Sequence, residues 1–333
     1  MKKPNIVCIG GGTGQSVVLK GLSKYPFNIT AIVGVTDNGG HSGVLRRALN
    51  IPQVGDIRNC ITALADKDNT LSQLIQYRFS EGKLEGVNLG NMIFACLIRI
   101  TGSLYEAINE ISRMLDLSYR VIPVSNGYAD ICATLVNGKT ICGEWEIIKR
   151  KPRTAIKQLF HKPIIPCLSE CKSAIKKADT IIFCPGSLQT GIISTLLVKG
   201  VRETIRNSKA TLIQICNIMT QPGLTDRFTD KDHIQLLSKY LGRKPDHFII
   251  NTEKPPPILL KIYNRSGSTP VESDSSRIED VKIITTPLVE HPSKKTLALY
   301  HRSGKGLLAG PHYIRHDADK LATTLISIIK ASI

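Results

Sequence analysis

The sequence has no long hydrophobic run. No stretch reaches the roughly 18 apolar residues that a membrane-spanning helix needs. The apolar run that follows Met1-Lys2-Lys3-Pro4 already ends at Gly10, which is too short for the core of a signal peptide. We therefore expect a cytoplasmic protein without a transmembrane segment.

Acidic side chains are scarce. The 333 residues include 27 Asp or Glu against 44 Lys or Arg, a net charge of +17. Much of the excess lies in the segment 149–177, where Glu170 is the only acid. Such a run could attract an anionic partner such as nucleic acid. However, Phe160 is its only aromatic residue, so the stacking residues of a single-strand binder are missing. We favour a solvated, lysine-rich surface and expect no nucleic acid partner.

The nine cysteines lack the spacing of a metal or redox site. Their number is odd, no Cys-x-x-Cys occurs, and Cys167 and Cys171 have no obvious partner pair for zinc. Cys8 and Cys184 lie inside apolar, strand-like runs. We therefore predict reduced thiols in a protein core.

Strand-like and helix-like runs alternate along the chain. This alternation predicts a single α/β domain over 1–333, with a Rossmann-like, doubly wound and mainly parallel sheet. The predicted strands are 6–9, 29–35, 180–184, 210–216 and 247–250, and the predicted helices are 90–116 (divided at 101–103), 230–241 and 318–329. A small antiparallel β insertion is expected at about 120–150, because Asn126-Gly127 and Asn137-Gly138 are hairpin signals. Residues 251–287 are expected to be mostly loop, with a short helix at 258–263.

Three glycine loops follow predicted strands, at 10–16, 36–43 and 185–190. Such loops let a ligand approach the backbone, and the next helix points free N–H groups at it. The first loop is neither a dinucleotide fingerprint, because Gln15 stands at the third glycine position, nor a P-loop, because it lacks the lysine. Its alternative role is a tight turn with Ser16 as the N-cap. The ligand-binding candidates here are Gly11, Gly12, Thr13, Gly14 and Ser16, with Gly186 and Ser187 in the third loop.

Two acids accompany the second loop and the segment after it. Asp37 could accept from a ribose hydroxyl, or it could hold Mg²⁺ together with Asp56. The alternatives are a turn residue for Asp37 and a helix N-cap for Asp56. Cations and amides nearby could clamp phosphate or read a base or sugar edge. The further candidates are Asn38, Gly39, Gly40, Arg46, Arg58, Asn59, Asn88, Asn91, Asn217, Thr220 and Gln221; Asn91 has a helix N-cap as its alternative. No catalytic triad is visible, and the histidines are expected on the surface or in the core, with His41 the one kept as a candidate ligand contact.

Together these motifs resemble one superfamily. It unites the phospholactate transferases of deazaflavin cofactor synthesis with the gluconeogenesis-factor (YvcK-like) proteins. The resemblance rests on the motifs at 10–16, 36–46, 55–59, 90–91 and 185–190. The motif Asn-Ile-Met-Thr-Gln-Pro-Gly at 217–223, Gly143-Glu144 and Arg315-His316-Asp317 are similar to the gluconeogenesis-factor branch. Four positions depart from the usual family pattern: Gln189, Gly191, Ser194 and Leu224.

The resemblance implies a regulatory protein that binds UDP-N-acetylglucosamine or UDP-glucose. It further implies a role in cell shape and envelope precursor supply during gluconeogenic growth, with protein partners in envelope synthesis, and implies no defined reaction. Tyr263 and Arg315 match family motifs, and we expect both to reach the ligand. The alternative is that Tyr263 packs in a loop and that Arg315 pairs with Asp317 or Asp319. The rival hypothesis is an enzyme that transfers a phospholactyl group from a GDP donor to a deazaflavin, with Mg²⁺ at Asp37 and Asp56. A homo-oligomer is compatible with either.

Overall fold

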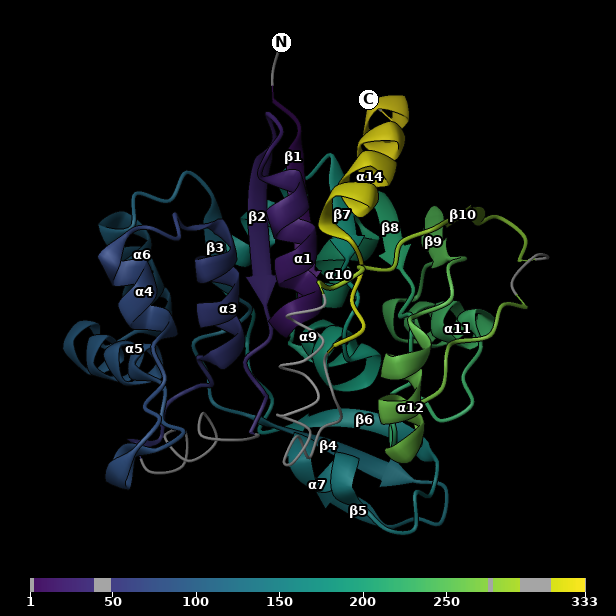
Figure 1. The fold of residues 1–333 in the computed structure, drawn as a ribbon, viewed down its shortest axis with the longest axis horizontal. Helices are drawn as coiled ribbons and strands as arrows, with labels where there is room; N and C mark the ends of the chain where they lie inside the picture. The colour runs from purple at the N-terminus through teal and green to yellow at the C-terminus, as the bar shows by residue number, and fades with distance from the viewer. Residues whose placement is uncertain (1–2, 39–48, 275–277, 294–312, 333) are drawn as a thin grey trace.

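The main element of the fold is a seven-stranded parallel sheet, seen in Figure 1. The computed structural model describes residues 3–38, 49–274, 278–293 and 313–332. The strand order is β10-β9-β8-β7-β1-β2-β3. The strands are β1 (Asn5–Gly10), β2 (Asn28–Val33), β3 (Arg120–Pro123), β7 (Thr180–Phe183), β8 (Thr211–Ile215), β9 (His247–Asn251) and β10 (Lys282–Thr286). The chain leaves β1 toward β2 on one side, and β7 continues the sheet on the other. Ligands of such folds bind at this switch point, beyond the carboxyl ends of the strands.

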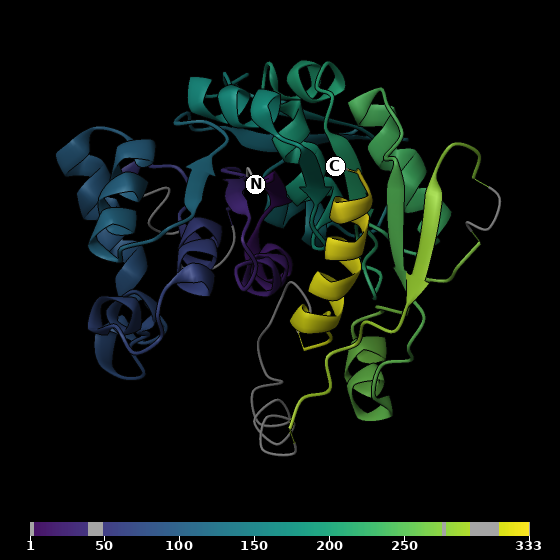
Figure 2. The ribbon, with the colours of Figure 1, turned by 90° about the horizontal axis from the view of Figure 1, so that it is seen from above.

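Helices cover both faces of the sheet. In Figure 2 the yellow α14 and the purple α1 lie on one side of the sheet and teal helices on the other. The helices are α1 (Gly12–Leu22), α3 (Gly55–Leu64), α4 (Thr70–Gln76), α5 (Leu89–Thr101), α6 (Leu104–Met114), α7 (Glu144–Lys149), α8 (Ser169–Lys177), α9 (Ser194–Leu197), α10 (Val201–Arg206), α11 (Asp230–Leu241), α12 (Pro257–Arg265) and α14 (Ala318–Ser332). A 3-10 turn (Gly82–Leu84) and a π-helix, η2 (Leu188–Ile193), complete them. Because both faces are covered, the central strands are continuous apolar runs, and Ile6 and Ile9 in β1 have no exposed surface.

Several predicted elements are confirmed. The helical region 90–116 divides where predicted, because Gly102 takes the left-handed conformation (φ 74°) that ends α5. The helix α11 ends at Gly242 in the same way (φ 76°) and begins with a capping box at Thr229. In the described part of the chain no single helix has the length and apolar character of a membrane span; α5 and α6 pass that test only as a pair, bent by 118°.

The antiparallel insertion is real, but its boundaries differ from the prediction. It consists of β4 (Asp130–Leu135), β5 (Thr140–Cys142) and β6 (Ile156–Lys162), in the order β5-β4-β6. Asn137-Gly138 forms the β4–β5 turn, with Gly138 at φ 85°. Asn126-Gly127 forms no hairpin, because the residues before it, 120–123, pair with β2 as the edge strand β3 of the main sheet. The third strand, β6, comes from the basic segment 149–177.

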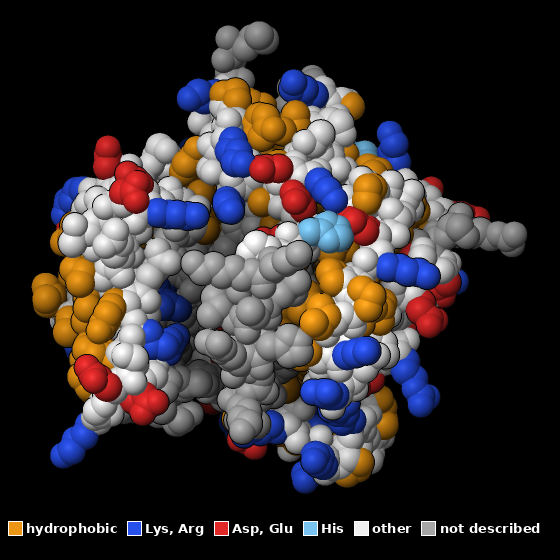
Figure 3. All heavy atoms as spheres, viewed as in Figure 1, with side chains coloured by type: hydrophobic (Ala, Val, Ile, Leu, Met, Phe, Trp, Pro, Cys, Tyr) orange, Lys and Arg blue, Asp and Glu red, His pale blue; other side chains and the backbone are white. Residues whose placement is uncertain are grey.

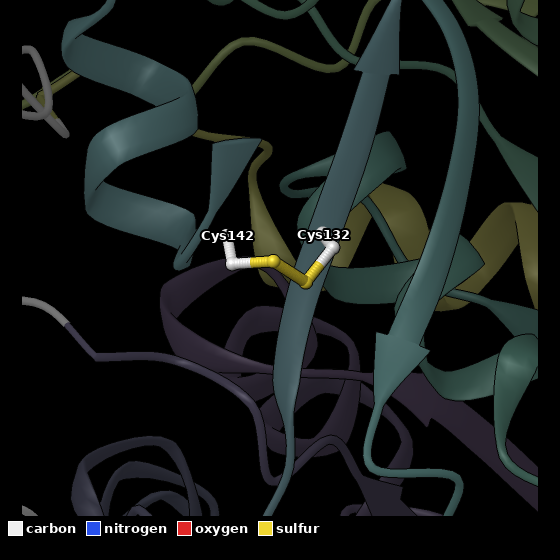
Figure 4. The surroundings of a disulfide bond; sticks show 2 residues. All are labelled: Cys132 and Cys142. Atoms are coloured by element: carbon white, nitrogen blue, oxygen red, sulfur yellow. A yellow bond between two sulfur atoms is a disulfide. The ribbon is translucent and has the colours of Figure 1, made fainter. Parts of the chain in front are cut away.

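Two cysteines of this small sheet form a disulfide, so the prediction of reduced thiols is wrong for them. Cys132 and Cys142 are direct partners in the β4–β5 register, with Cα atoms 4.0 Å apart (Figure 4). The other seven cysteines are free, and six of these are buried. The spacing of cysteines along the chain could not show this pair, since only the strand register brings the two side chains together.

The region 251–287 contains more structure than predicted. The expected short helix is confirmed as α12, which begins at Pro257, a favourable first helical residue. The strand β10 was missed. It pairs only with β9, at the edge of the sheet, and its residues 282–286 are mostly half-exposed, so they lack the apolar run of a central strand.

Candidate functional site

The first glycine loop passes directly into α1. Gly11 is the N-cap residue and supplies no side-chain cap, and Gly12 has a φ of 58°, a conformation that favours glycine. Ser16 is therefore inside the helix and not its N-cap; its hydroxyl donates to the carbonyls of Gly12 (2.9 Å) and Asn59 (3.1 Å). The first turn of α1 thus has no side-chain cap from its own helix, and its N–H groups need acceptors from elsewhere, as at other helix N-termini.

Gln15, at the position of the missing third glycine, has a structural role. Its side chain is fully buried, and its Nε2 donates to the carbonyls of Cys8 (2.8 Å) and Ile32 (3.1 Å). Its Oε1 accepts from the thiol of Cys60. Gln15 thereby joins β1 to β2 below the loop, where a dinucleotide fingerprint would have glycine.

The first and third glycine loops pack against each other at the switch point. A Cβ at Gly14 would lie 1.9 Å from the carbonyl oxygen of Pro185, so only glycine fits there. Gly186 has a φ of 139° and is held by Asn217. The Asn217 side chain accepts from the Gly186 N–H (2.9 Å) and donates to the Gly186 carbonyl (2.6 Å). The structure thus places the amide of Asn217, a candidate for reading a base or sugar, on the loop as a brace.

A pocket opens beside these loops, with about 830 Å³ of space not filled by atoms, open solvent included. Its lining combines loop backbone, one cation and apolar side chains. The lining residues are Thr13, Gly14, Val17, Pro185, Gly186, Ser187, Asn217, Ile218, Met219, Thr220, Gln221, Pro222, Tyr263, Ser266, Ser268, Ile314, Arg315 and His316. The structure therefore brings nine of the sequence-derived candidates into one pocket: Thr13, Gly14, Gly186, Ser187, Asn217, Thr220, Gln221, Tyr263 and Arg315.

Tyr263 is tied to the segment that carries Arg315. Its hydroxyl accepts from the backbone N–H groups of Tyr313 and Ile314, both at 2.9 Å, and the residue is only 5% exposed. The neighbouring Thr220 is also fixed, because its hydroxyl accepts from the N–H of Thr269. These bonds hold the outer wall of the pocket in place, and they give Tyr263 a positioning role in addition to any contact with a ligand.

A cluster of carboxyl groups adjoins the pocket. Asp56 lies in the first turn of α3 but is not its N-cap: the helix begins at Gly55, and Gln53 Oε1 accepts from the Asp56 N–H (3.2 Å). Its own carboxylate accepts from the backbone of Gly12. Burial, and then the charge of Asp37, raise the pKa of Asp56 to about 7. The carboxyl group of Asp56, which comes from α3, thus takes the place of the side-chain cap that α1 does not provide for its own N-terminus.

Glu144, at the start of α7, is the third acid of the cluster, and the candidate set from the sequence did not include it. Its carboxylate accepts from the hydroxyl of Thr190 in η2. Burial, and then Asp37, raise the pKa of Glu144 well above its usual range. The only sequence signal for this residue is the Gly143-Glu144 pair of the family motif. A hydroxyl contact of 2.6 Å between Ser187 and Thr190 links this cluster to the pocket wall.

The remaining sequence-derived candidates lie outside the pocket lining. Asn38 accepts from the Trp145 N–H (2.9 Å) and so ties the start of α7 to the chain that follows β2. Asn88, rather than Asn91, is the N-cap of α5, and it accepts from the Asn91 N–H. Arg58 donates to the side chain of Asn59 (2.9 Å). Gly11, Gly12, Ser16, Asp37 and Asp56 also lie beside the pocket rather than in its lining; Gly39, Gly40, His41 and Arg46 fall outside the described residues.

The structure contains a serine–histidine contact that has no access to a substrate. Ser194 Oγ lies 2.9 Å from His161 Nε2 and 2.6 Å from Thr36 Oγ1, and Ser194 is 1% exposed. Burial lowers the pKa of His161 to about 4, so its imidazole is neutral. The described residues also contain no group of three or more His, Cys, Asp or Glu side chains arranged to hold a metal ion.

Comparison with known proteins agrees with this arrangement. The family model described as 2-phospho-L-lactate transferase CofD matches residues 6–289. A putative gluconeogenesis factor of Thermotoga maritima is 43% identical over 323 residues, 96% of this chain and 98% of the relative. The chain belongs to the gluconeogenesis-factor family, within the CofD superfamily.

Further relatives match over the full length. The gluconeogenesis factor of Bacillus subtilis is 37% identical, with 99% of each chain covered. A solved structure from Bacillus halodurans, described as a member of the UPF0052 family, aligns with a TM-score of 0.88 at 36% identity, covering 98% of this chain and 99% of that one. The gluconeogenesis-factor fold, with its mainly parallel sheet and small antiparallel sheet, is therefore shared along nearly the whole chain.

Proposed function

We propose that the pocket binds a nucleotide sugar of the UDP-N-acetylglucosamine or UDP-glucose type. The observation that carries this proposal is the meeting of two anion-binding elements in one pocket with an apolar wall. The first turn of α1 contributes Thr13 and Gly14 to the lining, and the other wall contributes Arg315. A helix N-terminus and a guanidinium are both suited to the oxygens of a diphosphate.

The other walls suit the uncharged ends of such a ligand. Ile218, Met219 and Tyr263 belong to one apolar cluster and also line the pocket. An aromatic edge and aliphatic side chains can pack on a uracil ring or the face of a sugar. Polar groups of Gln221 and Ser266 lie in the same lining and can complete the hydrogen bonds of the ligand.

Binding of this kind needs no acid–base pair, so we propose a regulatory rather than a catalytic role. We extend the proposal to cell morphogenesis and envelope precursor supply under gluconeogenic growth. The name that the relatives carry, gluconeogenesis factor, supports this part. Partner proteins of envelope synthesis, and a homo-oligomer, are compatible with it. Figure 3 shows Lys and Arg side chains at many places on the visible face; the proposal includes no nucleic acid partner.

Calorimetry tests the proposal. We expect UDP-N-acetylglucosamine or UDP-glucose to bind the wild-type protein, and GDP to bind more weakly. Each titration is repeated with and without Mg²⁺. If no uridine nucleotide binds in either condition, the proposal is wrong.

One observation favours a second candidate, a phospholactyl transferase that uses Mg²⁺. Asp37 and Asp56 lie beside the α1 N-terminus, and the family model that matches is that of the CofD transferases. Carboxylates are suitable ligands for Mg²⁺, which could stabilise a departing phosphate. Incubation with guanosine diphosphate that carries a lactyl group on its terminal phosphate, a deazaflavin and Mg²⁺ tests this alternative; formation of a phospholactyl-deazaflavin together with GMP as the leaving group would establish it.

A further inference from the structure

The helix α5 is apolar on two opposite faces. Its inner face packs into the core through Phe94, Ala95 and Ile98. Its outer face is exposed or half-exposed and carries a stripe of apolar residues at helical spacing: Leu89, Met92, Ile93, Cys96 and Ile100. Ile100 is 78% exposed, more than any other large hydrophobic side chain that the structure describes. A helix that is apolar all round normally lies buried, so the outer face of α5 lacks a covering partner within the described part of the chain.

The adjoining helix α4 extends this apolar surface. A Cβ at Gly90 would lie 2.2 Å from the carbonyl oxygen of Ile75, so α4 and α5 pack closely there. The Tyr77 carbonyl accepts from the Leu89 N–H (2.9 Å), which places Tyr77 beside the start of the stripe. Tyr77 is 49% exposed and Leu74 is 43% exposed. We call the stripe, Leu74 and Tyr77 together the α5 face; Figure 3 shows hydrophobic side chains gathered at the left edge, where Figure 1 places α5.

The charges around the α5 face are few and balanced. Arg99, in the last turn, is the only charged residue of α5. The loop before the helix adds Arg78 and Lys83, but it also adds Glu81 and Glu85. A surface that docks on an anionic membrane combines apolar side chains with a clear excess of Lys and Arg. The α5 face therefore fits an apolar protein surface better than it fits a membrane.

A second copy of the same face offers such a surface. In a two-fold arrangement with the helices antiparallel, one stripe packs on the other. The two Arg99 side chains then lie at opposite ends of the contact, each near the acidic loop that precedes the other helix, so like charges stay apart. We propose that the chain forms a dimer through its α5 face, with Cys96, in the middle of the helix, close to the two-fold axis.

The size of the face shows why α4 belongs to it. A helix of 13 residues is about 20 Å long and about 10 Å wide. Alone it falls short of the roughly 800 Å² that each partner buries in a stable interface, so the exposed Leu74 and Tyr77 must take part. None of the residues of the α5 face lines the pocket. The inference is therefore independent of the proposed nucleotide-sugar site.

Light scattering during gel filtration tests the proposal. We expect the wild type at micromolar concentration to have twice the 36.6 kDa mass of one chain. Ile100→Glu should have the mass of one chain, because an unpaired charge buried on each side should weaken the dimer about a hundredfold, which corresponds to roughly 2.8 kcal/mol. Val136→Glu is the matched control and should stay dimeric, since Val136 is 62% exposed and lies at the β4–β5 turn.

Two results would overturn the proposal. One is a wild type that is monomeric at every concentration; binding of that monomer to vesicles of anionic lipid, lost in Ile100→Glu, would then assign the α5 face to a membrane. The other is a dimer that Ile100→Glu leaves intact, which would place the interface elsewhere.

Chemical cross-linking covers the case in which Ile100→Glu does not fold. Cys96 is the only free cysteine that is exposed, and the other six are buried. A short bismaleimide, used without reductant so that the disulfide between Cys132 and Cys142 stays closed, should therefore join two wild-type chains through Cys96. Cys96→Ser should give no cross-linked product and should keep the mass of the dimer. A wild-type dimer that is not cross-linked contradicts the position of Cys96 near the axis, and the proposal with it.

Discussion

Two regions at the same edge of the sheet have opposite chemistry. The pocket is lined by hydrogen-bond donors, the α1 N-terminus and Arg315, beside an apolar wall. The neighbouring cluster of Asp37, Asp56 and Glu144 consists of carboxyl groups, and burial together with the charge of Asp37 raises the pKa values of Asp56 and Glu144. The two regions meet at Gly12, whose backbone in the first turn of α1 already donates to the carboxyl group of Asp56. Under the proposed function the diphosphate lies against the pocket wall and away from the carboxyl groups, because like charges repel.

The largest loss of stability is expected at Gly14, in the glycine loop that borders both the pocket and the carboxyl cluster. At Gly14 an added Cβ would meet a backbone carbonyl at 1.9 Å, and that carbonyl has no flexible side chain to move. Gly14→Ala should therefore destabilise the fold by about 3 kcal/mol or more, the upper range for overpacking, and disrupt pocket and cluster together. Urea denaturation measures this. Gly191→Ala is the control, since its nearest contact is an ordinary 3.7 Å; equal stability of the two variants would contradict the prediction.

A second prediction concerns His161, which lies in β6 of the small antiparallel sheet. Burial lowers the pKa of His161 to about 4, against roughly 6.5 in an unfolded chain. Between these values the unfolded state binds the extra proton, so stability that is present above pH 6.5 is lost as the pH falls toward 4. The slope is about 1.4 kcal/mol per pH unit. His161→Gln should flatten this acid limb in unfolding free energies measured from pH 4.5 to 7; an unchanged slope would show that His161 titrates normally.

The pocket wall can be changed without touching the cluster. Tyr263→Phe removes the acceptor of two backbone N–H groups, those of Tyr313 and Ile314. Each buried donor left without a partner costs about 1–3 kcal/mol, and Arg315 loses its support. We expect weaker binding of UDP-N-acetylglucosamine along with reduced stability. If Tyr263→Phe binds normally while Tyr263→Ala does not, the ring itself, and not the hydroxyl, is what the ligand needs.

The variant Arg315→Lys tests whether binding needs the planar guanidinium of Arg315 or only its positive charge. Lysine keeps the positive charge but cannot form the paired, planar bonds of a guanidinium. A loss of about tenfold in affinity corresponds to roughly 1.4 kcal/mol. Calorimetry with UDP-N-acetylglucosamine measures it, and Arg113→Lys, in an exposed pair with Glu110 on α6, is the matched control. Equal affinities for the two variants would remove Arg315 from the site.

The smallest effect on stability is expected from a substitution of Asp56, which belongs to the carboxyl cluster and does not line the pocket. Asp56 has a raised pKa of about 7, so the stability from its protonated form is lost as the pH rises through 7. Asp56→Asn keeps an acceptor for the Gly12 N–H and removes the charge. It should flatten the stability profile between pH 6 and 8 by about 1 kcal/mol and abolish any effect of Mg²⁺ on nucleotide binding. An Mg²⁺ effect that survives in this variant would place the cation elsewhere.

The sequence by itself determined the features that depend on neighbouring residues of the chain. Continuous apolar runs predicted the buried parallel strands, Gly102 and Gly242 predicted two helix ends, and the glycine loops predicted the edge of the sheet at which the pocket lies. Each of these features depends on residues next to one another in the chain, because periodicity and backbone conformation are local properties.

Tertiary structure decided what depends on partners far apart in sequence. Residues 120–123 became β3 because β2 offered them an edge, and Cys132 met Cys142 through strand register. Asp56 accepts a hydrogen bond from the backbone of Gly12 and does not cap its own helix. Asn217 likewise accepts from Gly186, and Glu144 accepts from Thr190. The same residue type can hydrogen-bond within its own turn or to a turn that is distant in the sequence, so the sequence does not distinguish the two. The choice is made in the packed structure at the edge of the sheet, because burial makes an unpaired polar group costly.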